Sequence, residues 1–133
     1  VEVPPMAMIE GVTLTTTTTY VKNHEDEARA LIMALIDGIH FFKTNKSDTL
    51  AILKKHCSQL LKMHDDAEWN CFYETQSETL EKAPYPSIDA IQNVFALAVK
   101  RDPEIKEYNP LALWDLHYVK EIDDSGYIRQ LYA

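Results

Sequence analysis

Residues 11–42 contain the stretch GVTLTTTTTYVKNHEDEARALIMALIDGIHFF, in which five consecutive threonines precede a strongly amphipathic segment. The branched Cβ atoms of threonine suit an extended backbone, and Val12 and Leu14 alternate with threonines as in a half-buried strand. A threonine hydroxyl can also cap the helix that follows, and the run can equally be a polar linker. The alternation favours the first of these structures, so we expect a strand in the residues before and up to Tyr20.

The amphipathic half of the same stretch predicts the most secure helix of the chain. Asn23 can cap this helix, and the three acids at residues 25–27 suit the positive end of its dipole. We expect Leu35 and Ile36, in the middle of the helix, to be buried. Apolar residues recur at three- and four-residue steps and so form one face: Ala28, Leu31, Ile32, Leu35, Ile36, Ile39 and Phe42.

Shorter helical patterns fill the rest of the chain. Apolar residues recur at helical spacing after Ser47, after Asp65 and after Ser87, and each of these polar residues can cap a helix. The prolines in residues 82–87 interrupt the pattern, because proline removes a hydrogen-bond donor. Gly126 is a typical left-handed helix stop.

The sequence therefore predicts a mainly α fold with about five helices and one N-terminal strand. We expect residues 1–133 to form a single domain or a fragment, with an extended segment over residues 1–20 and a helical portion over residues 21–133. A lone strand needs a neighbour for its backbone donors and acceptors. We therefore expect that part of the fold is missing or is supplied by another chain.

The charge balance argues against two classes of partner. The net charge is -8, whereas nucleic-acid binding requires clustered lysines and arginines, and anionic membrane surfaces attract the same residues. No apolar run approaches the roughly 20 residues that a membrane-spanning helix needs. The first ten residues do not resemble a signal peptide. We expect neither nucleic acid as a partner nor direct membrane insertion.

Catalytic and metal-binding patterns are weak. None of the five histidines is four residues from another, so no helix presents an adjacent pair of them. His56 and Cys57 are neighbours, and neighbouring helical residues point about 100° apart, which does not suit a Cys–His catalytic pair. Cys57 and Cys71 fit no redox or metal spacing, and no phosphate loop or nucleophile motif is present. We expect no enzyme activity, no cofactor and no metal site.

Several segments, taken in order, are similar to one protein family. Residues 15–56 and residues 83–132 resemble parts of the periplasmic solute-binding proteins of ABC importers for nitrate, sulfonates, taurine and thiamine-pyrimidine precursors. The second region contains the motifs YPS-x-x-x-IQNV, at residues 85–94, and D-x-SG-[FY]-I-x-x-LY, at residues 123–132. The resemblance covers nearly the whole chain. The cysteine-rich iron motif of the fungal pyrimidine synthases in this superfamily is absent from the sequence, so their chemistry is not carried over.

The resemblance implies a function and a location. It corresponds to the C-terminal part of a two-lobed α/β periplasmic-binding-protein fold, whose partners are a small solute and the importer permease, in the periplasm or another extracytoplasmic compartment. It places Thr17, Thr18 and Tyr20 near the junction of the lobes, as candidate ligand-binding residues. Strand pairing or helix capping would account for the same residues. The alternative function is a stand-alone helical protein-interaction module with no ligand cleft.

The part of the family fold that this chain lacks also predicts self-association. Without the sheet of the other lobe, the wide apolar face within residues 28–42 would be bare, and soluble monomers seldom expose large apolar patches. A strand over residues 12–17 would also offer an unpaired edge. We expect a two-fold homodimer, although the net charge of -8 opposes association.

Overall fold

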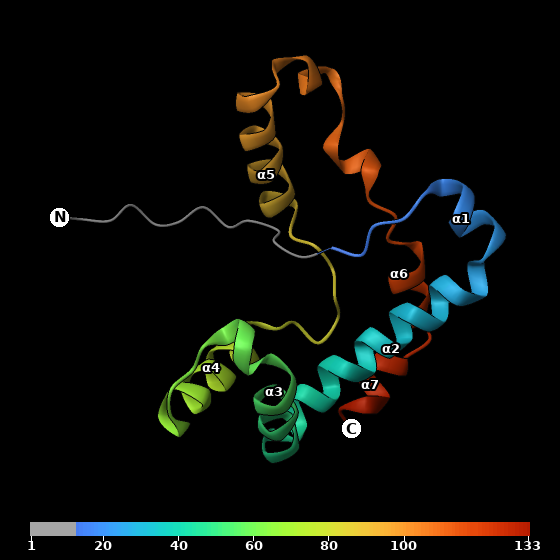
Figure 1. The fold of residues 1–133 in the computed structure, drawn as a ribbon. Coiled ribbons are helices and arrows are strands. Elements are labelled where there is room, and N and C mark those ends of the chain that lie inside the picture. Colours follow the sequence, from blue (N-terminus) through green and yellow to red (C-terminus); the bar gives the residue numbers. More distant parts are fainter. Residues whose placement is uncertain (1–12) are drawn as a thin grey trace.

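The computed structural model describes residues 13–133, which form helices joined by short connections (Figure 1). The expected mainly α class is confirmed. The α-helices are α1 (Thr18–Asn23), α2 (Glu25–Thr44), α3 (Lys46–Leu61), α4 (Asp66–Thr79), α5 (Ile88–Arg101), α6 (His117–Asp124) and α7 (Tyr127–Leu131). Two 3-10 helices lie between α5 and α6, η1 (Pro103–Glu107) and η2 (Pro110–Leu113).

The expected N-terminal strand is wrong for the residues that the structure describes. Residues 13–17 form no strand, and the helix α1 begins at Thr18, so the extended segment ends before Tyr20. The Thr17 hydroxyl accepts the backbone N–H of Tyr20 at 3.1 Å and caps α1. Within residues 13–133 there is no strand for it to pair with, and Thr17 caps the start of α1 instead. The part of the expected strand before Thr13 lies outside the described residues.

Side-chain caps at two other helices are confirmed. The Asp65 carboxylate accepts the backbone N–H of Glu68 at 2.9 Å and starts α4. The Ser87 hydroxyl accepts the N–H of Ala90 at 3.4 Å and starts α5. Gly126 follows α6 with a φ of 81°, a left-handed conformation that glycine adopts without steric cost.

Two other expected caps are wrong, because the chain turns within a single residue at both places. Asn23 is the last residue of α1, and His24 alone separates α1 from α2. Ser47 lies inside α3, because Asn45 alone separates α2 from α3. The acids at residues 25–27 do occupy the first turn of α2, as expected.

The helix α2 is the central element of the fold. It packs against α1, α3, α6 and α7, and α4 packs against α3. The helix α5 packs mainly on η1 and η2, and these three elements form an arm that stands away from α3 and α4 in Figure 1. An ion pair between Arg29 and Glu121 at 2.7 Å joins α2 to α6, and the Tyr127 hydroxyl donates to Asp37 at 2.6 Å.

The core lies between α2 and the two C-terminal helices. Ile36 is completely buried and packs with Ile122 and Ile128, and the partly buried Ile32 and Leu131 surround them. The expected burial of Ile36 is therefore confirmed. The hydrophobic centre combines residues from opposite ends of the chain, so its formation closes a long loop.

The opposite side of α2 is uncovered. Leu35 is 40% exposed and Leu31 is 56% exposed, so the expectation that Leu35 is buried is wrong. A Cβ atom added at Gly38 would meet nothing within 4 Å. The helix carries apolar residues on both sides, and α6 and α7 cover only one of them. We call the uncovered side the outer face of α2 and define it by five exposed residues: Leu31, Ala34, Leu35, Gly38 and Phe41.

Candidate functional site

The three candidate ligand-binding residues lie together at the start of α1. Thr17 is the N-cap, Thr18 is the first helical residue, and Tyr20 lies two residues further on; all three are exposed. The Thr17 hydroxyl is already engaged in the cap, and the Tyr20 hydroxyl donates to Oε2 of Glu27 at 2.6 Å. The hydroxyls of Thr17 and Tyr20 therefore perform structural tasks in this conformation.

Tyr20 belongs to a small polar cluster that joins α1 to α2. Its ring stacks on His24 with the ring centroids 4.5 Å apart. His24 Nδ1 lies 2.9 Å from Oε1 of Glu27, so the two carboxylate oxygens of Glu27 contact two different side chains. A polar hollow of about 380 Å³ lies beside this cluster, and residues 22–27 line it. Thr17, Thr18 and Tyr20 are not among its lining residues.

The pH response of this cluster is a testable consequence of its geometry. The Tyr20 hydrogen bond, together with His24, lowers the pKa of Glu27 below its ordinary value. Because the pKa of Glu27 is lowered in the folded protein, its contacts stabilise the junction of α1 and α2 at pH values above the ordinary carboxyl pKa. This stabilisation is lost as the pH falls through the lowered pKa. We expect Tyr20→Phe to raise the pKa of Glu27 in an NMR titration of its side-chain carboxyl carbon. Tyr108→Phe, which makes the same change at an exposed tyrosine far from this cluster, should leave the pKa of Glu27 unchanged. Equal titration curves for the parent chain and the two variants would contradict the hydrogen bond between Tyr20 and Glu27.

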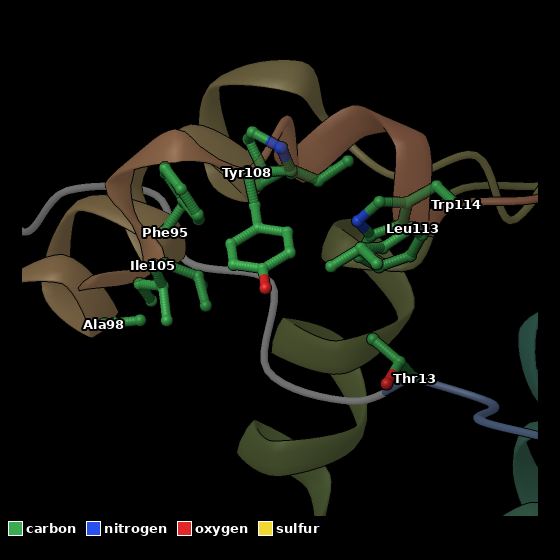
Figure 2. Close-up of a pocket in the computed structure, with 10 residues that line it drawn as sticks. Thr13, Phe95, Ala98, Ile105, Tyr108, Leu113 and Trp114 are labelled. Atoms are coloured by element: carbon green, nitrogen blue, oxygen red, sulfur yellow. The ribbon is translucent and has the colours of Figure 1, made fainter. Parts of the chain in front are cut away.

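A second hollow, larger than the polar one, lies on the α5 arm. It has a volume of about 460 Å³. Figure 2 shows the Tyr108 ring near the middle of this groove, with Phe95, Ala98 and Ile105 on one side and Leu113 and Trp114 on the other. We call it the α5 groove. Its lining is almost entirely apolar: Thr13, Ile91, Val94, Phe95, Ala98, Ile105, Tyr108, Pro110, Leu113 and Trp114.

Local sequence explains how the groove is built. Asp102 and Asn109 cap η1 and η2, and a proline follows each cap as the first residue of its short helix. The residue that follows each short helix is aromatic: Tyr108 follows η1 and Trp114 follows η2. The repeated order of cap, proline and terminal aromatic residue therefore brings two rings to the same side of α5.

Sequence reasoning missed this groove. The apolar residues that recur after Ser87 form a helical face typical of a buried one. Ile91 is indeed buried, but Val94, Phe95 and Ala98 line an open hollow. The available signal was the pair of Asx–Pro turns, each followed within six residues by an aromatic residue. Periodicity identifies an apolar face but does not show whether the protein itself covers it.

Comparison of the chain with models of protein families, with curated proteins and with solved structures finds no match. Within residues 13–133, no three His, Cys, Asp or Glu side chains lie together in a way that could hold a metal ion. None of the helices in the same range is both long enough and apolar enough to span a membrane.

Proposed function

We propose that this chain is the mainly helical, C-terminal part of a solute-binding component of an ABC-type importer. Its solute would be small, of the nitrate, sulfonate, taurine or pyrimidine-precursor kind, and it would be bound and delivered without being transformed. The proposal draws its family from the two resembling regions, residues 15–56 and 83–132. The importer permease is then its membrane partner, and the periplasm or another extracytoplasmic compartment is its location.

The outer face of α2 is the observation that carries the proposal. A helix of 20 residues buries one side against α6 and α7 and leaves the apolar residues of its other side in solvent. Helices in α/β proteins occupy layers that cover a sheet, and their apolar faces require that cover. A soluble protein seldom leaves such a face bare. A further layer of the same protein would cover it, and in the isolated chain a second copy would do so as a homodimer.

The α5 groove favours a second candidate function. An apolar hollow lined by three aromatic residues suits a protein segment better than a nitrate or sulfonate ion, because it offers few polar groups. A stand-alone helical interaction module would use this groove and need no solute cleft. The two candidates differ in what the native protein binds.

Isolation of the native protein with an antibody against this chain separates the two candidates. We expect a polypeptide more than twice the length of the 133 residues, with saturable binding of nitrate, taurine or an aminopyrimidine in calorimetric titration. We also expect Thr18→Val to weaken that binding, whereas Thr16→Val, a matched change in the same threonine run, should leave it unchanged. A native protein of only 133 residues that binds none of these solutes would exclude the importer function and leave the interaction module.

A further inference from the structure

We propose that the α5 groove binds an extended apolar segment of this same chain, residues 1–9, with the sequence VEVPPMAMI. These residues lie outside the described range, and the proposal rests on the groove, on the point where the described chain begins, and on the sequence. It concerns a contact within the chain and does not depend on the importer function.

The position of Thr13 supplies the first argument. Thr13 is the first described residue and lines the groove itself, so the segment before it is attached at the edge of the hollow (Figure 2). An extended chain covers about 3.3 Å per residue, so the preceding residues are long enough to cross a hollow of this size. Attachment also gives the segment an effective concentration on the order of millimolar at the groove, which a free ligand does not have.

The chemistry of the segment supplies the second argument. Residues 1–9 are apolar except for Glu2, and the groove is lined almost entirely by apolar side chains. Proline favours the extended polyproline conformation, so two consecutive prolines, Pro4 and Pro5, would reduce the entropy lost on binding. Grooves edged by aromatic residues are a recurring means of binding proline-containing extended segments.

Two polar groups at the groove match the backbone of such a segment. Tyr108 is 68% exposed, and its hydroxyl makes no hydrogen bond within residues 13–133. The indole N–H of Trp114 likewise has no hydrogen-bond acceptor in this range. An extended segment presents carbonyl oxygens that both groups can bind, whereas a purely hydrocarbon ligand would leave them unused.

A spin-label experiment on the full 133-residue chain tests the contact. The label is attached at Glu2→Cys, far from Thr13 along the chain, in a background of Cys57→Ser and Cys71→Ser. We expect loss of the methyl NMR signals of Leu113 and Ile105, with the signals of Ile52 in α3 retained. Addition of an excess of unlabelled peptide with the sequence of residues 1–9 should restore the lost signals.

A matched pair of variants shows whether the groove is responsible. Leu113 is 80% exposed in the groove and Leu60 is 81% exposed on α3, so an aspartate at either position leaves the buried core intact. We expect Leu113→Asp to abolish the label effect at Ile105 and Leu60→Asp to leave it unchanged. Equal behaviour of the two variants, or no signal loss in the parent chain, would overturn the proposal.

The same experiment identifies the other occupants. Signal loss at Leu31 and Leu35 in place of Leu113 would place the segment on the outer face of α2 and contradict the proposal. A second arm mixes spin-labelled chains with separate isotope-labelled chains that carry no spin label. Signal loss that appears only in this mixture would mean that the segment of a second copy occupies the groove, which would contradict the proposal. Both results are distinct from failure of the importer function, which the solute titration tests separately.

Discussion

Replacing Ile36 by alanine is expected to lower the free energy of unfolding by about 2–5 kcal/mol, because the change leaves a cavity at the centre of the core. Ile36 is completely buried against Ile122 and Ile128. A loss of this size is a large part of the roughly 5–15 kcal/mol that keeps a domain folded. Urea denaturation followed by circular dichroism measures it.

Leu35→Ala is the matched control, since it truncates the neighbouring residue of the same helix. Leu35 is 40% exposed on the outer face of α2, so we expect a loss below about 1 kcal/mol in the isolated chain at concentrations where it is monomeric. Equal losses for the two variants would show that both sides of α2 are covered. A larger loss for Leu35→Ala than for Ile36→Ala would show that the described core is on the wrong side.

Replacing Lys43 by methionine is expected to lower the free energy of unfolding by about 1–3 kcal/mol, because Lys43 caps the end of α4. Its Nζ donates to the backbone carbonyls of Ser77 and, at 2.8 Å, of Leu80, in a partly buried position. The carbonyls at the end of a helix have no partner within the helix, and a positive charge suits that end of the dipole. Methionine keeps most of the side-chain length and removes the charge and the donors.

Lys55→Met is the control for this change, because Lys55 is exposed in the neighbouring helix α3. We expect it to change the free energy of unfolding by less than about 0.5 kcal/mol. Limited proteolysis should also cut α4 faster in the Lys43→Met protein than in the parent chain. Unchanged stability and unchanged cleavage with Lys43→Met would mean that the two carbonyl contacts do not hold α4.

The helices were accessible from the sequence because their signals are local. The apolar period of α2, the acids in its first turn, and the caps Asp65 and Ser87 act over one or two turns, and the structure confirms them. The same local signals conflicted at the threonine run, where branched side chains favoured a strand and Thr17 favoured a cap. The cap is formed, because a strand needs a partner and no strand lies within residues 13–133.

What the sequence could not show is which apolar surface is covered. Leu31 and Leu35 have the same character as Ile32 and Ile36, and only the distant helices α6 and α7 distinguish the two sides of α2. The sequence likewise could not show that the α5 groove is left open. Apart from Thr13, its lining residues come from α5, from η1 and η2, and from the residue that follows each short helix. Each of these residues looks like an ordinary buried residue in its own segment.

Chemical labelling of the outer face of α2 tests the central claim most directly. A cysteine introduced by Leu31→Cys, with Cys57 and Cys71 changed to serine, is treated with a maleimide reagent. The reaction is followed in the intact native protein and in the isolated chain, diluted until light scattering gives the mass of a monomer. If a further layer of the same protein covers this face, the rate of maleimide labelling should be at least about tenfold lower in the intact protein than in the isolated chain. Equal rates in the two proteins would contradict the account, because the face would then be bare in the native state as well.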